Sequence, residues 1–143
     1  MIIGVPREIK VGETRVSMTP NLCRRLTGLG ARVVVEKGAG VSAGFSDVQY
    51  REAGATVANQ AGAVWKRADL VLKVKEPLEA EFPHLRSGLA LFTYLHLAAN
   101  PQLADTLAQR RVLAIGYETV EAADGTLPLL KPMSQIAGRL SVS

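Results

Sequence analysis

Three side chains, far apart in the sequence, could together bind and act on a small anionic substrate. They are Arg15 in "GETRV", Lys75 in "KVKEP" and His96 in "YLHLA". Arginine offers a bidentate fork to a carboxylate, lysine places a point charge at a carbonyl or carboxylate oxygen, and histidine exchanges a proton near neutral pH. Two fixed cations and one imidazole would make a receptor for a small α-keto or α-amino acid.

Each of these residues also has a simpler interpretation. Arg15 could be a solvated loop charge, and Lys75 could face solvent because it alternates with Lys73 in "LKVKEP". His96 could be a core histidine that is hydrogen-bonded to backbone groups. The second histidine, His84 in "FPHLRSG", lies in a polar loop and is expected at the surface. The fold that positions the three residues must decide between these alternatives.

Short apolar runs alternate with helical patterns along the chain. Thr19 ahead of Pro20 marks one helix start, and Ser46 with Gln49 forms a capping box at another. Strands are predicted at 1–6, 31–37, 55–58, 69–75, within the apolar run 89–97, and at 112–120. Helices are predicted at 19–30, 46–54, 59–68, 100–111 and from 132 onward, with Pro132 in the first turn.

This alternation predicts a doubly wound α/β fold: a mostly parallel sheet with helices on both faces, in three layers, of the flavodoxin or Rossmann kind. Strands such as "RVVVE" and "VLAIGY" fit it because both of their faces are apolar. Ligands of such sheets lie beyond the carboxyl ends of the strands. Arg15 follows the first strand, Lys75 ends the strand 69–75, and His96 lies near the end of the next. We therefore expect the three to converge at one sheet edge.

Composition narrows the functional classes. A chain of 143 residues, 48% apolar and 21% charged, fits one globular domain. Its longest apolar run is too short and too interrupted to cross a bilayer, and no secretory signal is evident. The single cysteine, Cys23, excludes an internal disulfide and indicates a reducing, cytoplasmic location. The net charge of +4 is dispersed and aromatic residues are only 5%, which argues against nucleic-acid binding.

The glycine-rich segment 36–47, "EKGAGVSAGFSD", superficially matches a dinucleotide-binding loop. The required helix does not begin there, because the Ser46 cap comes later, and no strand ending in an acid follows at the required distance. We interpret the segment as a surface loop. Cys23 lies beside a leucine stripe and is expected to be packed, and no metal ligands are predicted.

Dispersed blocks of the sequence, in order, resemble the N-terminal part of alanine dehydrogenase. These blocks are "MIIGVPREIKVGETRVSMTP", "VEKGAGVSAGFSD", "DLVLKVKEP", "LFTYLHLAANPQL" and "YETVEAADGTLPLLKPMSQIAGR". The resemblance covers essentially the whole chain. It implies an oxidoreductase that interconverts L-alanine and pyruvate, using NAD and releasing ammonia. It also implies a homo-oligomer, because the family forms hexamers.

The resemblance also implies a role for each matching site residue. Arg15 would bind the substrate carboxylate. Lys75 would hold the carboxylate or carbonyl and help to polarise it. His96 would be the acid–base group near the substrate oxygen or nitrogen. The remaining implied positions are Tyr94 and Met133, which would line the pocket, and Ser134 in "KPMSQ", which would approach the nicotinamide of the cofactor.

Members of this family are more than twice as long as 143 residues. By the resemblance, residues 1–131 form the N-terminal portion of the substrate domain, and 132–143 begin a connecting helix to an NAD-binding domain. The chain contains no G-x-G-x-x-G fingerprint, so we expect a truncated or split enzyme that is inactive alone.

Three alternatives remain open. One is a non-catalytic substrate-sensing module, and another is an oligomerisation module. The third is a relative of the nucleotide-binding subunit of proton-translocating transhydrogenase. That subunit shares the first blocks but lacks the pair that Lys75 and His96 form here. Lysine and saccharopine dehydrogenases are more distant relatives.

Overall fold

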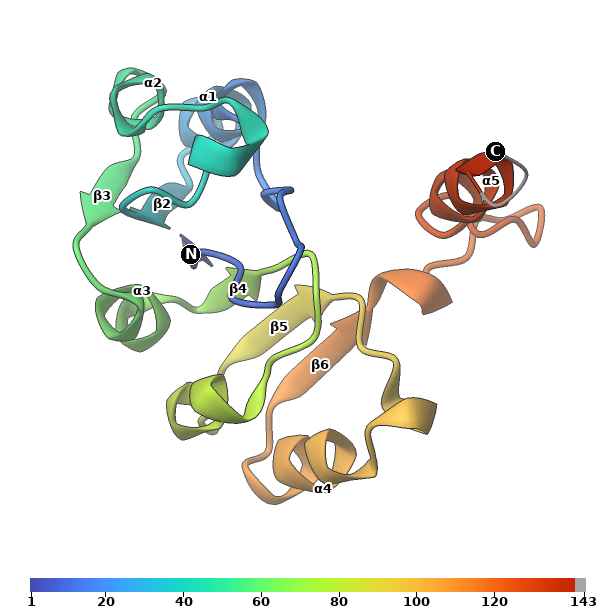
Figure 1. The fold of residues 1–143 in the computed structure, drawn as a ribbon. Helices are drawn as coiled ribbons and strands as arrows, with labels where there is room; N and C mark the ends of the chain where they lie inside the picture. The colour runs from blue at the N-terminus through green and yellow to red at the C-terminus, as the bar shows by residue number, and fades with distance from the viewer. Residues whose placement is uncertain (141–143) are drawn as a thin grey trace.

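Six parallel strands form one sheet in the computed structural model, which describes residues 1–140 (Figure 1). The strands are β1 (Ile2–Val5), β2 (Arg32–Glu36), β3 (Thr56–Ala58), β4 (Leu70–Leu72), β5 (Ala90–Thr93) and β6 (Leu113–Gly116). Their order is β3-β2-β1-β4-β5-β6, and every adjacent pair is parallel. The predicted doubly wound α/β fold is therefore confirmed.

Two of the helices begin at the capping signals that the sequence carries. Thr19 accepts the N–H of Leu22 at 3.3 Å, and the Ser46 hydroxyl accepts the N–H of Gln49 at the same distance. The Gln49 side chain returns to the N–H of Ser46 at 2.8 Å, which completes the predicted capping box. The α-helices are α1 (Pro20–Gly28), α2 (Asp47–Glu52), α3 (Ala61–Arg67), α4 (Pro101–Gln109) and α5 (Lys131–Leu140). The 3₁₀ helices are η1 (Val41–Ala43), η2 (Glu79–His84), η3 (Leu97–Ala99) and η4 (Tyr117–Thr119).

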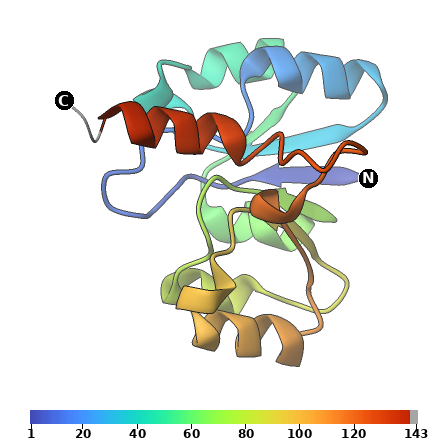
Figure 2. The same cartoon turned by 90° about the vertical axis from the view of Figure 1, so that its right-hand side faces the viewer.

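The sheet lies between two layers of helices, as Figure 2 shows from the side. Helices α1 and α2 pack on one face, where Cys23 and Tyr50 are fully buried against β1 and β2. Helices α3 and α4 pack on the other, around Trp65 and Leu91. Burying each large apolar side chain stabilises the fold by roughly 1.5–3 kcal/mol. Helix α5 stands apart from these layers, beyond the segment that follows β6 (Figure 1).

Three strands end earlier than the apolar pattern predicts. β4 ends at Leu72 and not at residue 75, β5 ends at Thr93 within the run 89–97, and β6 ends at Gly116 and not at residue 120. Beyond β4 and β5 the carboxylates of Glu8 and Glu118 take the backbone N–H groups of Val74 and Leu95. After β6 the chain turns directly into a 3₁₀ helix, Tyr117–Thr119. The pattern of apolar residues indicates which residues are buried, and burial continues past the residue at which strand pairing stops.

β6 differs from the prediction in a second respect, since only part of it is buried. Leu113 is 64% exposed and Ile115 is 40% exposed, although both faces of "VLAIGY" were expected to be covered. β6 is the edge strand of the described sheet, next to β5 alone. One face of its apolar pattern therefore lies open within the part of the chain that the structure describes.

The strand order places the sheet's switch point between β1 and β4. β1 continues through α1 toward β2, whereas β4 continues toward β5 on the opposite side. The loops that leave two such strands diverge and open a crevice at their carboxyl ends, where ligands bind in this class of fold. The loop after β1 carries Arg15, and the segment after β4 carries Lys75.

Candidate active site at the carboxyl ends of the strands

Arg15 is held by a glutamate two residues before it. Glu13 Oε1 lies 2.8 Å from Arg15 Nε, Glu13 Oε2 lies 2.6 Å from Nη2, and Oε1 also accepts the Arg15 backbone N–H at 2.8 Å. The guanidinium lowers the pKa of Glu13, and this carboxylate in turn raises the pKa of Arg15. The Glu13 side chain is only 5% exposed, whereas that of Arg15 is 43% exposed. The guanidinium is thus oriented by protein yet open to a ligand.

A cavity of about 540 Å³ lies beside Arg15. Met133 closes one side, with its sulfur 3.1 Å from Arg15 Nη1, and the Tyr94 hydroxyl donates to the Leu129 carbonyl at 2.6 Å. Arg15, Tyr94 and Met133 therefore surround the same space. The other lining residues are mainly apolar and include Val16, Leu72, Val74, Phe92 and Tyr117. This arrangement suits a small ligand with a carboxylate at one end and an apolar group at the other.

Lys75 is half-buried, and its backbone is held from two sides. Its N–H donates to Glu8 Oε2 at 3.4 Å, and its carbonyl accepts the Thr93 hydroxyl at 2.9 Å. The other oxygen of Glu8 accepts the N–H of Val74 at 2.7 Å. The loop after β1 and the end of β5 thereby fix the segment after β4.

Lys73, two residues before Lys75, is the buried member of the alternating pair, with 1% of its side chain exposed. Its Nζ lies 3.1 Å from Glu8 Oε2 and 2.9 Å from Glu81 Oε1. Burial raises the pKa of Glu81, although the Lys73 charge opposes this rise. Sequence alternation could not tell which lysine is buried, because the two carboxylates that pair with Lys73 come from η2 and from the loop after β1.

His96 lies three residues beyond β5, in left-handed backbone with φ 49° and ψ 42°. Glu118 Oε1 accepts the N–H of His96 at 2.8 Å and that of Leu95 at 3.0 Å. Burial opposes ionisation of Glu118, but the N–H donors outweigh it and hold its pKa below the usual range. The imidazole is exposed, so the interpretation of His96 as a core histidine is wrong.

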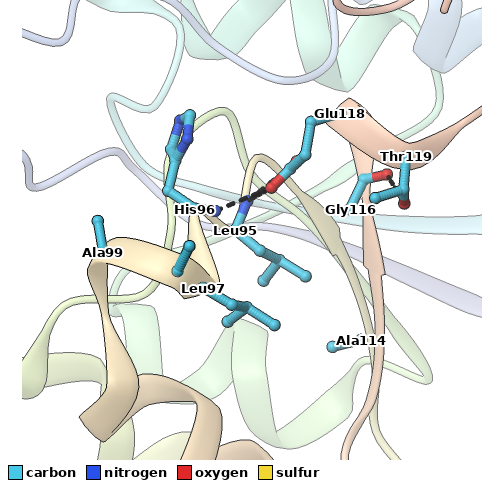
Figure 3. Close-up of a pocket in the computed structure, with 9 residues that line it drawn as sticks. Leu95, His96, Leu97, Ala99, Ala114, Gly116, Glu118 and Thr119 are labelled. Atoms are coloured by element: carbon cyan, nitrogen blue, oxygen red, sulfur yellow. Dashed lines mark hydrogen bonds between the residues drawn. The ribbon is translucent and has the colours of Figure 1, made fainter.

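The His96 ring does not line the cavity beside Arg15 but contacts Tyr94, which does. It stacks on the Tyr94 ring with centroids 6.1 Å apart and an interplanar angle of 14°. The His96 backbone lines a second cavity, of about 500 Å³, with Leu97 and Ala114. Figure 3 shows the imidazole pointing away from Leu97 and Ala114, while the Glu118 carboxylate meets the backbone. Tyr94 therefore links His96 to the cavity beside Arg15.

The residue that could face a nicotinamide is Ser134, in the first turn of α5. Its side chain is exposed, it follows Met133 at the cavity, and its N–H donates to the Leu130 carbonyl at 3.1 Å. An exposed hydroxyl at the edge of an apolar cavity suits the polar carboxamide of a nicotinamide ring.

The glycine-rich loop borders the site, because Gly38 and Ser42 line a cavity of about 370 Å³ together with Arg15. Its Gly38 N–H donates to Asp47 Oδ1 and α2 begins only after Ser46, but Ala39 and Gly40 are buried, so the segment is only partly the surface loop that was expected. Cys23 is fully buried. His84, expected at the surface, is instead half-buried and stacks 5.9 Å from Trp65. Among the described residues, neither a helix able to span a membrane nor a metal-ligand cluster is found.

Two functional candidates, Glu8 and Glu118, were missed by sequence reasoning. Glu8 is not among the residues that the sequence singles out, and Glu118 falls within the predicted strand 112–120. Each reaches a distant backbone segment, 66 and 22 residues away in sequence. No local pattern signals such a contact. The only usable clue is an acidic residue at the carboxyl end of a parallel strand.

Comparison with known proteins places this arrangement in a family. Residues 4–137 match the family model described as alanine dehydrogenase/PNT, N-terminal domain. The chain is 52% identical over 141 residues to an alanine dehydrogenase from Staphylococcus saprophyticus, covering 99% of this chain and 38% of the relative. An alanine dehydrogenase from Mycolicibacterium smegmatis is 49% identical over the same length and coverage.

Solved structures give the same result. An L-alanine dehydrogenase superposes with a TM-score of 0.94 at 50% identity, covering 99% of this chain and 39% of that one. A transhydrogenase from Sinorhizobium meliloti superposes with a TM-score of 0.77 at 30% identity, covering 82% of this chain and 35% of that one. The chain thus spans about two fifths of the length of its alanine dehydrogenase relatives. It belongs to the alanine dehydrogenase/PNT family and matches that family's N-terminal domain.

Proposed function

We propose that this chain is the substrate-binding portion of an NAD-dependent L-alanine dehydrogenase, which converts L-alanine, NAD and water to pyruvate, ammonia and NADH. The observation that carries the proposal is Arg15, an oriented but exposed guanidinium at the mouth of a small apolar cavity. Similarity at 52% identity to an alanine dehydrogenase supports the same assignment.

Arg15 binds the substrate carboxylate in this proposal. Three of its N–H groups contact Glu13 and Met133 in the described part of the chain, and a guanidinium has five. The two that remain can donate to a carboxylate, in the bidentate geometry that arginine favours. The methyl group of alanine or pyruvate then lies against apolar lining such as Phe92 and Val74.

Lys75 and His96 carry the chemistry in this proposal. The Lys75 ammonium lies against the carbonyl or carboxylate oxygen and draws electron density from the carbonyl carbon as ammonia adds. His96 donates a proton to the oxygen that leaves as water, and it takes a proton in the opposite direction. Stacking of His96 on Tyr94 supports this role, because it brings a titratable ring to the cavity from a backbone held by Glu118.

NAD supplies the hydride acceptor in oxidation of the amino acid. Ser134 would hold its nicotinamide end, and Met133 with Tyr94 would exclude water from that side of the cavity. We propose that residues 1–131 form the N-terminal portion of the substrate domain and that 132–143 begin the connection to a nucleotide-binding domain. Helix α5, which begins at Lys131 and stands apart from the sheet, supports this division, and residues 141–143 lie outside the described part. We further propose a cytoplasmic homo-oligomer, on the strength of the family.

The transhydrogenase match favours a second candidate function, a nucleotide-binding subunit of that enzyme. A turnover assay separates the two. The natural full-length protein, incubated with pyruvate, ammonium and NADH, is expected to oxidise NADH only when both pyruvate and ammonium are present. Hydride exchange between two nicotinamide nucleotides without pyruvate would favour the transhydrogenase candidate. Pyruvate binding seen by calorimetry in a protein that never turns over would instead favour a substrate-sensing module.

A further inference from the structure

The three polar residues of the candidate site share one structural feature. The backbone N–H of each donates to the carboxylate of a glutamate. The pairs are Arg15 with Glu13 at 2.8 Å, Lys75 with Glu8 at 3.4 Å, and His96 with Glu118 at 2.8 Å. Each of these carboxylates therefore acts on the main chain of a site residue, whichever contacts its side chain makes.

The three glutamates come from different parts of the chain. Glu13 lies within the same loop as its partner, Glu8 lies 67 residues before its partner, and Glu118 lies 22 residues after. A hydrogen bond from an N–H to a carboxylate is roughly twice as strong as one to a neutral acceptor. The contacts of Arg15 and His96, at 2.8 Å, are of this strong kind. That of Lys75 is long, at 3.4 Å, but Glu8 also holds the neighbouring N–H of Val74 at 2.7 Å.

We propose that Glu8, Glu13 and Glu118 are positioning residues, which hold the site through its backbone before substrate binds. This inference rests on the proposed function. Its strongest member is Glu118, because the backbone that it holds is unfavourable by itself. His96 is a non-glycine residue in left-handed conformation, which costs about 1–2 kcal/mol. Glu118 fixes it there by accepting the N–H groups of two successive residues, Leu95 and His96.

Without Glu118 the left-handed turn loses the hydrogen bonds from the N–H groups of Leu95 and His96. The backbone at His96 then relaxes toward ordinary right-handed or extended values, which swings the Cα–Cβ bond and carries the imidazole off the Tyr94 ring. Misplacing a catalytic group by about 1 Å costs on the order of a hundredfold in rate. Substrate binding at Arg15 is unaffected, since Glu118 contacts neither that side chain nor its glutamate within the described residues.

The test compares Glu118→Ala and Glu118→Gln with Glu121→Gln, an exposed glutamate three residues further on, in the natural full-length protein. Glutamine keeps an oxygen for both N–H groups, but its NH₂ group faces the Leu95 N–H. We expect kcat for pyruvate to fall roughly thirtyfold in Glu118→Ala and about threefold in Glu118→Gln, with KM changed less than threefold. Glu121→Gln is expected to match the wild-type protein.

A double mutant distinguishes positioning from a general loss of structure. When His96→Ala is already present, no imidazole remains to be positioned, so adding Glu118→Ala should change the residual rate less than threefold. A full thirtyfold further loss would overturn the inference, as would wild-type kcat in Glu118→Ala. If Glu118→Ala does not fold, Glu118→Gln carries the test: its roughly threefold loss of kcat should disappear when His96→Ala is already present, and a threefold loss that persists there would overturn the inference. A wild-type protein that never turns over pyruvate would refute the proposed function, but not the hydrogen bonds by which Glu118 holds the backbone at His96.

Discussion

The buried hydroxyl of Thr93 donates a hydrogen bond to the carbonyl of Lys75 at 2.9 Å, so the end of β5 holds the segment that follows β4. Thr93 is fully buried, and valine has nearly the same shape without the hydroxyl. We expect Thr93→Val to lower the free energy of unfolding by about 1 kcal/mol, because one buried carbonyl loses its partner.

The measurement is urea unfolding of the natural full-length protein, with Thr56→Val on β3 as the control. Thr56 is exposed, so its hydroxyl is replaced without uncovering a buried carbonyl. The control should unfold within about 0.5 kcal/mol of the wild-type protein. Equal stability of Thr93→Val and the wild type would show that this hydrogen bond does not hold Lys75.

Arg15 gives a prediction about substrate affinity. Lysine in its place keeps the charge but cannot bind Glu13 and a carboxylate through parallel N–H groups. Losing one hydrogen bond to a charged group costs about 1.5–3 kcal/mol, so KM for pyruvate should rise roughly ten- to a hundredfold in Arg15→Lys. Steady-state kinetics measures this, with the exposed Arg24→Lys of α1 as the matched control. An unchanged KM would remove Arg15 from the substrate site.

The left-handed backbone at His96 gives a prediction that separates stability from activity. Its φ of 49° suits glycine better than any other residue, and its side chain is exposed. His96→Gly should therefore be about 1 kcal/mol more stable than His96→Ala, while both lose turnover. The control is Ala108→Gly on the exposed side of α4, where glycine should instead cost about 1 kcal/mol. Denaturant unfolding that ranks His96→Ala above His96→Gly would contradict the left-handed turn.

The buried cluster of Lys73, Glu8 and Glu81 gives a pH prediction. Because burial raises the pKa of Glu81, the folded state binds its proton more tightly than the unfolded chain does. Stability from this group is complete below the ordinary glutamate pKa and is lost as pH rises through the higher folded value.

Glu81→Gln should accordingly lose this dependence. As pH rises from about 4 to 8, the free energy of unfolding of the wild type is expected to fall relative to that of Glu81→Gln. The control is Glu79→Gln, at an exposed position in the same 3₁₀ helix. Thermal unfolding across this pH range provides the measurement, and a constant difference at all pH values would argue against a raised pKa.

The alternation of elements and the capping signals were sufficient to predict the fold. The Thr19 cap and the Ser46–Gln49 capping box mark helix starts because each is a contact between residues a few positions apart, which sequence spacing encodes directly. The sheet followed from the same reasoning, since strands that alternate with helices typically pair in parallel.

What the sequence did not predict depends on contacts between distant segments. The identity of the buried lysine, Lys73, depends on Glu8 and Glu81, and the left-handed turn at His96 depends on Glu118. Exposure of Leu113 and Ile115 depends on which strand lies at the sheet's edge. None of these relationships produces a sequence pattern at fixed spacing. Periodicity therefore predicts that the three polar residues lie at one edge of the sheet, but it does not predict which contacts hold them.

The central claim is that the Lys75 ammonium, brought to the end of β4, acts on the substrate carbonyl. The most direct measurement is the rate of NADH oxidation with pyruvate and ammonium by wild-type protein and by Lys75→Met, at natural full length. Methionine keeps the length and the apolar stem but removes the charge. We expect a loss of at least about a hundredfold in kcat/KM, because a preorganised charge at a developing oxyanion contributes that much. Turnover by Lys75→Met at the wild-type rate would contradict the account.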